Sequence, residues 1–292
     1  MAAMNFRVAF ALVIAISTTW IFHDSSAAEE TGAASYEASD YQESEFDPWG
    51  APTQRWPDVL SPGLGEEETY YYWTREDRKS LLREGTELKP LHVWVGGDSL
   101  AGGAALGFRE LTRSEHRWEY TEDVRKSTGV VSDWYFDWES HLENEIADGP
   151  YEVIVLSIGG NDWQGFRGGP TEKGSVEWSE KYRARISRML QTLDRPGRLV
   201  IWVGMPHFRI PFMVPLPNAV NPITRNVFES GERSSWIDAA AIVSPDGVWV
   251  KHVTDENGKT IEVRTDDGTH YQSNGARLIT AAVVNAIEQR TR

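Results

Sequence analysis

The stretch LHVWVGGDSLAGG at residues 91–103 decides the fold of this 292-residue chain. Apolar side chains alternate through its first half, which is typical of a buried strand, and Gly96 and Gly97 then let the backbone turn sharply. The small apolar residues at 101–106 predict a helix directly after the turn. Ser99 is therefore expected between the carboxyl end of a strand and the amino end of a helix, where open α/β sheets bind ligands. A purely structural turn would need the same glycines, so this stretch alone assigns no site.

Strand-like and helix-like segments alternate along the rest of the chain. The pattern predicts strands at 118–124, 151–158, 199–203 and 236–243, helices at 137–146, 178–193 and 273–289, an irregular proline-rich segment at 211–222, and a β-hairpin of 248–253 with 260–264. A short helix from Thr74 to Gly85 is expected to lead into this domain. Alternating strands and helices imply a mainly parallel sheet covered on both faces, which is a three-layer α/β/α fold.

The first 28 residues are predicted to be a signal peptide. Arg7 precedes an apolar run at 8–22 that is short for a membrane span, and small residues follow it. An uncleaved amino-terminal membrane anchor is the alternative, and either would place the protein in the periplasm or outside the cell. Residues 29–73 contain many acids and a single base, which predicts a flexible acidic linker, and residues 74–292 are expected to form the folded domain.

The composition excludes several classes of site and partner. The net charge of −15 argues against nucleic acid or an anionic lipid surface as a partner, so membrane contact is expected only through the amino-terminal segment. The absence of cysteine excludes disulfides, a thiolate metal site and a cysteine nucleophile.

Three short motifs carry the residue types of acyl transfer. They read Gly97-Asp98-Ser99-Leu100, Gly159-Gly160-Asn161-Asp162 and Asp267-Gly268-Thr269-His270. A serine hydroxyl needs an adjacent base, a histidine can take its proton, and a carboxylate can orient and stabilise the imidazole. A side-chain amide can donate to the oxyanion that forms. Asp98 is expected to brace its own turn instead of reacting.

The ordered set of motifs resembles the SGNH (GDSL-type) hydrolase superfamily, and the resemblance covers roughly Leu91 to the carboxyl terminus. Within that superfamily, the Ser-Thr-Gly-Val run at 127–130 before Asp137-Trp138, together with the Trp-Val-Gly-Met-Pro segment at 202–206, resembles DUF459, a bacterial exported group of undefined function. The resemblance implies a flavodoxin-like three-layer fold. It also implies that Ser99 is the nucleophile, His270 the general base and acid, and Asp267 its orienting carboxylate.

The same resemblance implies an oxyanion hole made by the backbone N–H groups of Ser99 and Gly129 and the side chain of Asn161. The small-residue signature around Gly129 is degenerate, so Ser132 or a neighbour is an alternative for that position. His207 and Arg209 follow a predicted strand end and are candidates for lining the pocket.

No metal and no cofactor are expected, because the spacing of the candidate ligands fits no zinc pattern. The candidate ligands are Asp98, Asn161, Asp267 and His270.

These expectations define a serine-dependent esterase that acts through an acyl-enzyme on an acylated small molecule or glycan, with acetyl on an envelope or extracellular glycan favoured. An O-acyltransferase would use the same residues, since the two activities differ in water exclusion and acceptor binding. A non-catalytic envelope protein that binds a glycan or a protein partner is the third interpretation.

Overall fold

The computed structural model describes residues 81–255 and 257–291, and a five-stranded sheet organises them. The strands are β1 Leu91–Gly97, β2 Trp118–Val124, β3 Val153–Ser157, β4 Leu199–Val203 and β5 Ser234–Ile237. Their order is β2-β1-β3-β4-β5, and every neighbouring pair is parallel. This order is the flavodoxin-like one.

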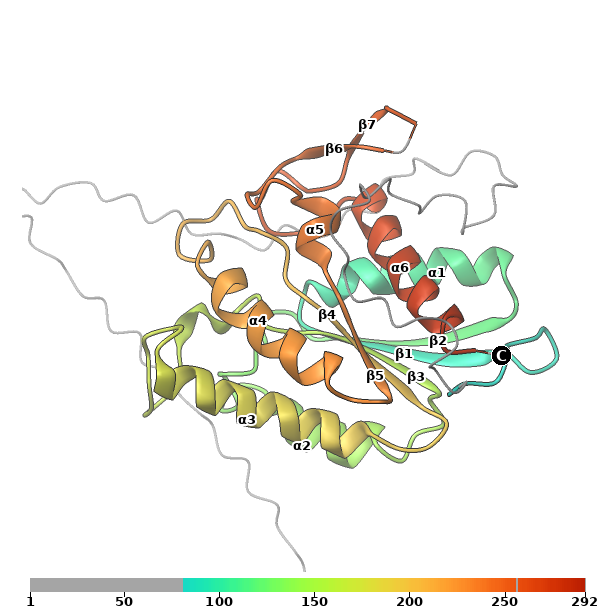
Figure 1. The fold of residues 1–292 in the computed structure, drawn as a ribbon, viewed down its shortest axis with the longest axis horizontal. Coiled ribbons are helices and arrows are strands. Elements are labelled where there is room, and N and C mark those ends of the chain that lie inside the picture. Colours follow the sequence, from blue (N-terminus) through green and yellow to red (C-terminus); the bar gives the residue numbers. More distant parts are fainter. Residues whose placement is uncertain (1–80, 256, 292) are drawn as a thin grey trace, which may run out of the picture. The chain divides into compact units, whose positions relative to one another are not determined.

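Helices cover both faces of the sheet (Figure 1). They are α1 Ala101–Ser114, α2 Trp138–His141, α3 Val176–Leu193, α4 Leu216–Glu229, α5 Ala239–Val243 and α6 Ser273–Glu288, with a π-helical turn η2 Leu142–Ile146 and a 3₁₀ turn η3 Asp162–Gln164. α1 packs with α6 on one face, and α2, α3 and α4 lie on the other. The predicted three-layer α/β/α fold with a parallel sheet is confirmed.

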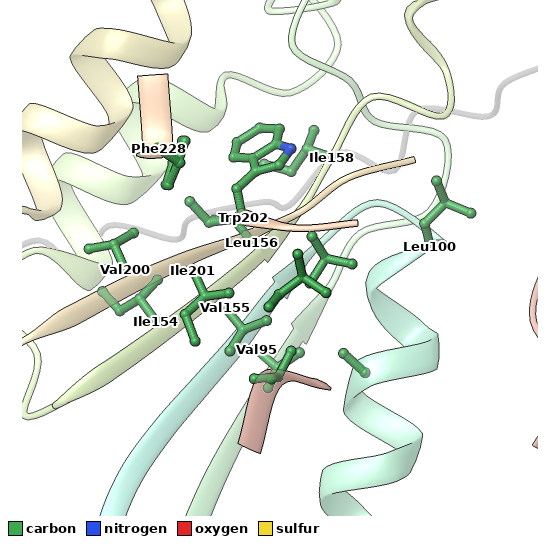
Figure 2. Close-up of a cluster of buried hydrophobic side chains, with 14 of the residues drawn as sticks. Val95, Leu100, Ile154, Val155, Leu156, Ile158, Val200, Ile201, Trp202 and Phe228 are labelled. Carbon is green, nitrogen blue, oxygen red and sulfur yellow. The ribbon is translucent and has the colours of Figure 1, made fainter. Parts of the chain in front are cut away.

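The core lies on both sides of the central strands. Every residue of β3 and β4 is buried, as expected of parallel strands covered on both faces. Figure 2 shows side chains of β3 and β4, including Val155 and Ile201, packed together with Val95 of β1 and Leu100 of the following turn. This tightly packed centre gives the loops at the carboxyl ends of the strands a rigid base.

The strand order reverses between β1 and β3. The chain leaves β1 for β2 on one side and returns to β3 on the other, so the loops after β1 and β3 diverge. Open α/β sheets bind their ligands at this switch point. The Gly97–Leu100 turn follows β1 and the Gly159–Asp162 turn follows β3, so the fold brings these two motifs to one place.

Two predicted segments are wrong. The segment 211–222, expected to be irregular, contains the first half of α4, because Pro217 stands in the first turn, where a missing N–H is tolerated, and Pro222 is accommodated inside the helix. The strand predicted at 236–243 ends at Ile237, because the carboxylate of Asp238 accepts the N–H of Ala241 and starts α5.

The predicted carboxyl-terminal hairpin and helix are present, but the first strand of the hairpin begins at His252 instead of residue 248, and the second ends at Glu262 instead of residue 264. β6 His252–Thr254 pairs antiparallel with β7 Thr260–Glu262, and α6 ends within one residue of its expected end.

The predicted signal peptide at 1–28 and the linker at 29–73 lie outside the described residues and stay predictions. Residues 81–85 are not helical, so the predicted helix does not reach Gly85; Leu82 instead forms a bridge with Thr291. None of the helices in 81–255 or 257–291 is long and apolar enough to cross a membrane.

Candidate active site

Ser99 lies in the turn between β1 and α1. Gly97, the last residue of β1, has a φ of +145°, and a Cβ there would lie 2.0 Å from the carbonyl oxygen of Ser157. Only glycine fits this conformation and this approach. The turn then places Ser99, partly exposed, one residue before Leu100 and the start of α1.

Ser99, His270 and Asp267 form an unbroken chain of hydrogen bonds. The Oγ of Ser99 lies 2.9 Å from Nε2 of His270, and Nδ1 of His270 lies 2.7 Å from Oδ2 of Asp267. Ser99 and His270 are 171 positions apart in the sequence. The structure thus brings together the three residues that the sequence singled out as the relay.

Asp267 is held in its charged form. Its Oδ1 accepts the hydroxyl of Thr265 at 2.6 Å and the N–H groups of Thr269 at 2.7 Å and His270 at 3.0 Å. Burial raises the pKa of Asp267, but the hydrogen bonds from His270, Thr265 and Thr269 outweigh it and bring the pKa well below its ordinary value. A charged carboxylate at Nδ1 leaves Nε2 able to accept the proton of Ser99.

Asn161 and Gly129 lie on neighbouring loops. The side-chain amide of Asn161 donates to the carbonyl oxygen of Thr128 at 2.8 Å. An amide carries two hydrogens, so this bond fixes its orientation and leaves the second for another acceptor. Gly129 packs against Asp162, and a Cβ at Gly129 would lie 2.2 Å from Oδ1 of that residue. Ser132, the alternative to Gly129, is only 2% exposed.

Asp98 joins the first two motifs. It is fully buried, and its carboxylate accepts the N–H groups of Leu100, Gly159 and Gly160, each at 2.8 Å. Burial raises the pKa of Asp98 to about 6, although these hydrogen bonds act in the opposite direction. The expected bracing role of Asp98 therefore extends beyond its own turn.

Asp162 joins the second motif to the loop that contains Gly129. Its Oδ1 accepts the N–H of Val131 at 3.0 Å and its Oδ2 accepts the hydroxyl of Tyr182 at 2.8 Å. Asp162 is fully buried, and burial raises its pKa to about 7. The only signal for this role in the sequence is weak: an acid that follows a buried strand and its glycines.

Arg264 holds the loop of His270 in place through hydrogen bonds. Its buried guanidinium donates to the carbonyl oxygens of Thr269 at 2.7 Å, His207 at 2.9 Å and His270 at 3.1 Å. Burial lowers its pKa. Sequence reasoning missed this residue, because an arginine at the end of a hairpin strand usually faces solvent.

His207 and Arg209 contact the same loop. The carbonyl oxygen of His207 accepts from Arg264, and the backbone N–H of Arg209 donates to the carbonyl oxygen of Gly268 at 3.0 Å. The guanidinium of Arg209 donates to the carbonyl oxygen of Asp266 and lies 4.6 Å from the ring of Trp249. The two candidates for lining the pocket therefore help to position the loop that carries His270. In the part of the chain that the structure describes, no group of three or more His, Asp or Glu side chains is placed to hold a metal ion.

Comparison with solved structures finds similar proteins of low sequence identity. A lipase/acylhydrolase from Enterococcus faecalis is 14% identical with a TM-score of 0.47, and the match covers 68% of this chain and 96% of that one. A carbohydrate acetylesterase family member from Sinorhizobium meliloti is 13% identical with a TM-score of 0.46, covering 68% and 98%. A catalytic mutant of an acetylxylan esterase from Geobacillus stearothermophilus is 14% identical with a TM-score of 0.48, covering 72% and 96%.

No curated protein matches the sequence. The family model described as "Protein of unknown function (DUF459)" matches residues 92–286, which run from β1 to α6 and include all three motifs. The chain belongs to the DUF459 family, as its motifs predicted.

Proposed function

We propose that the protein is a serine-dependent ester hydrolase that forms an acyl-enzyme on Ser99. The observation that carries this proposal is the relay itself, in which 2.9 Å separates Ser99 Oγ from His270 Nε2 and 2.7 Å separates His270 Nδ1 from Asp267 Oδ2. Both distances lie in the range over which a base takes a proton from a nucleophile. The resemblance of the motifs to the SGNH superfamily supports the same reaction.

In the first half of the reaction, Ser99 Oγ attacks the ester carbonyl carbon while its proton moves to Nε2 of His270. The tetrahedral intermediate collapses, the bond to the alcohol breaks, and His270 returns the proton to the leaving oxygen. In the second half, His270 takes a proton from water while the water oxygen attacks the acyl carbon. The bond from this carbon to Ser99 Oγ then breaks, His270 returns the proton to Oγ, and the acid leaves. Asp267 stabilises the imidazolium in both halves.

Asn161, with the backbone N–H groups of Ser99 and Gly129, is proposed to stabilise the oxyanion. The hydrogen bond from Asn161 to Thr128 supports this role, because it holds the amide in one orientation before the substrate arrives. Removing one such donor costs about 10²–10³ in turnover.

The substrate is proposed to be a small acyl ester, such as an acetyl ester, of a glycan outside the cytoplasm. This finer statement depends on the SGNH resemblance and on the export signal predicted at residues 1–28.

The test is covalent labelling of the purified protein with a fluorophosphonate, followed by mass mapping of the modified residue. Ser99 is the expected site, and Ser99→Ala is expected to abolish both labelling and release of acetate from vinyl acetate. Ser114→Ala, at the exposed end of α1, is the matched control and keeps both. Unchanged acetate release by Ser99→Ala would overturn the proposal.

A further inference from the structure

Exposed aromatic side chains gather on the loops that follow β2, β3 and β4. Among the described residues, the large aromatic side chains with high exposure are Trp134, Tyr135, Trp163 and Phe212. All four lie beyond the carboxyl ends of their strands, at the edge of the sheet that carries Ser99. Exposed apolar surface that gathers at one place commonly marks a binding site.

Trp163 and Phe212 form a pair, here called the aromatic ledge. Their ring centroids are 4.7 Å apart with the planes inclined by 53°, and they remain 39% and 53% exposed. The rings thus touch each other across two separate loops while a large part of each stays in solvent. Packing alone would have favoured burying them.

The ledge joins the loop of Asn161 to the loop after β4, and the loop after β4 contacts the loop of His270. Trp163 stands two residues after Asn161, so their Cα atoms are at most about 7.6 Å apart. Phe212 directly precedes Met213, whose sulfur accepts the hydroxyl of Thr269 at 3.8 Å. Thr269 is the residue before His270, so the loop that carries Phe212 contacts the loop that carries the proposed base.

Each residue of the ledge is next in sequence to a buried, hydrogen-bonded residue. Trp163 follows Asp162, which is fully buried and bonded to Val131 and Tyr182. Met213, beside Phe212, is 6% exposed, and its N–H donates to the carbonyl oxygen of Ile210 at 2.9 Å. A preorganised surface of this kind binds without a cost of ordering its loops.

We propose that the aromatic ledge of Trp163 and Phe212 binds a sugar ring of the substrate and places its acyl ester at Ser99. The proposal rests on the proposed ester hydrolysis and names the class of alcohol. The face of an aromatic ring carries partial negative charge and attracts the C–H groups on one face of a pyranose.

Polar groups beside the ledge favour a sugar over an acyl chain. The ammonium of Lys173 donates to the backbone carbonyl oxygen of Trp163 at 2.8 Å. A sugar presents hydroxyl groups at its rim and C–H groups on its face, which matches a ring bordered by a cation. An acyl chain would need continuous apolar walls.

The test compares a ring-bearing ester with ring-free ones. Trp163→Ala and Phe212→Ala are expected to raise KM for glucose pentaacetate about tenfold with kcat within about twofold, while kcat/KM for vinyl acetate stays unchanged. Trp163→Phe and Phe212→Tyr keep a ring and should restore KM. Equal losses on both esters would mean that the pair only supports the loops, and would overturn the proposal.

Trp134→Ala is the matched control. Trp134 is 54% exposed, but the guanidinium of Arg167 lies 5.4 Å from its ring, so that face is already occupied. Its removal should leave KM for glucose pentaacetate unchanged; a tenfold rise there too would contradict a specific ledge. A selective loss on vinyl decanoate in the ledge variants would assign the rings to an acyl chain and would also overturn the proposal.

Binding is measured separately in Ser99→Ala. Calorimetry with glucose pentaacetate should detect binding in this variant and about tenfold weaker binding when Trp163→Ala is added. This result does not need hydrolysis, so a failure of the ester hydrolase proposal and a failure of the ledge are distinguishable.

Discussion

Asp267 lies partly exposed on the loop before α6, whereas Asp98 and Asp162 lie fully buried in the turns after β1 and β3. Burial raises the pKa of all three carboxylates, and hydrogen bonds lower it. Only at Asp267 do the hydrogen bonds outweigh burial, so its pKa falls below the ordinary value, whereas the pKa of Asp98 rises to about 6 and that of Asp162 to about 7. The comparison separates two uses of one side chain. Asp267 keeps a charge for the imidazole, and the other two hold backbone in place.

Asp267→Asn should give the largest effect on activity. The amide oxygen would keep the bonds from Thr265 and Thr269, so the NH₂ group would face His270 and force its proton onto Nε2. The kcat for vinyl acetate is expected to fall about 10⁴-fold, with the melting temperature little changed. Asp266→Asn, next to it and 80% exposed, is the control and keeps its activity. If Asp267→Asn kept more than a tenth of the wild-type activity, the imidazole would not need the charge of Asp267, and the contrast with Asp98 and Asp162 would be wrong.

Asp98→Asn should give the largest effect on stability. Its neighbours are the N–H groups of Leu100, Gly159 and Gly160, so either orientation of the amide sets its NH₂ group against a donor. The free energy of unfolding, measured with urea at pH 7, is expected to fall by about 4 kcal/mol, since each unsatisfied buried group costs about 1–3 kcal/mol. A loss of unfolding free energy no larger than that of Asp162→Asn would contradict the view that the three N–H groups bonded to Asp98 stabilise the fold.

Asp162→Asn should change the pH dependence of stability. The carboxyl has an ordinary pKa of 3.8 when unfolded and about 7 when folded, so between these values the folded state holds more protons and stability falls as pH rises. The amide can accept from Val131 and donate to Tyr182, and it never ionises. From pH 4 to pH 8, the variant should therefore gain on the order of 4 kcal/mol relative to wild type. A constant difference in urea unfolding across this range would contradict the raised pKa.

The pKa of Asp267 is lowered, so its contribution has the opposite sign: it is present above pH 3.8 and is lost as the pH falls further. Urea unfolding below pH 4 should therefore show wild type losing stability relative to Asp267→Asn.

Thr265→Val should give the smallest effect. It removes one of the hydrogen bonds that hold Asp267 and leaves those from Thr269 and His270 in place. The kcat for vinyl acetate is expected to fall about two- to fivefold, which corresponds to less than about 1 kcal/mol. Thr112→Val in α1 is the control. A loss approaching that of Asp267→Asn would mean that the charge of Asp267 depends on this one hydroxyl.

Much of the sheet could be predicted because its strands have a local signature. β1 and β2 alternate in strand fashion, β3 and β4 are short continuous apolar runs followed by glycine, and α3 and α6 have apolar faces at helical spacing. The errors in predicting helices and strands occurred where single residues have more influence on the local structure than the pattern of the residues around them. Pro217 and Pro222 made the α4 sequence look irregular, although both residues lie within the helix. Asp238 caps α5 and so divides an apolar run into a strand, β5, and a helix, α5.

The relay residues could be named from sequence, but the long-range contacts of the groups that support them could not. Ser99, Asp267 and His270 stand in recognisable motifs. Asp98 and Asp162 each accept from a partner 31 to 62 positions away, and the guanidinium of Arg264 reaches back to His207 across 57 positions. Such contacts depend on how the loops fold over the end of the sheet, which no local pattern encodes.

The carboxylate of Asp98 ties the serine turn to Gly159 and Gly160. A chimera that exchanges only one of these turns with a distant relative would separate the acceptor from its donors. Residues 97–162, exchanged as a unit, would carry both halves of the contact. An exchange that moves both turns together therefore preserves this contact, whereas an exchange of either turn alone breaks it.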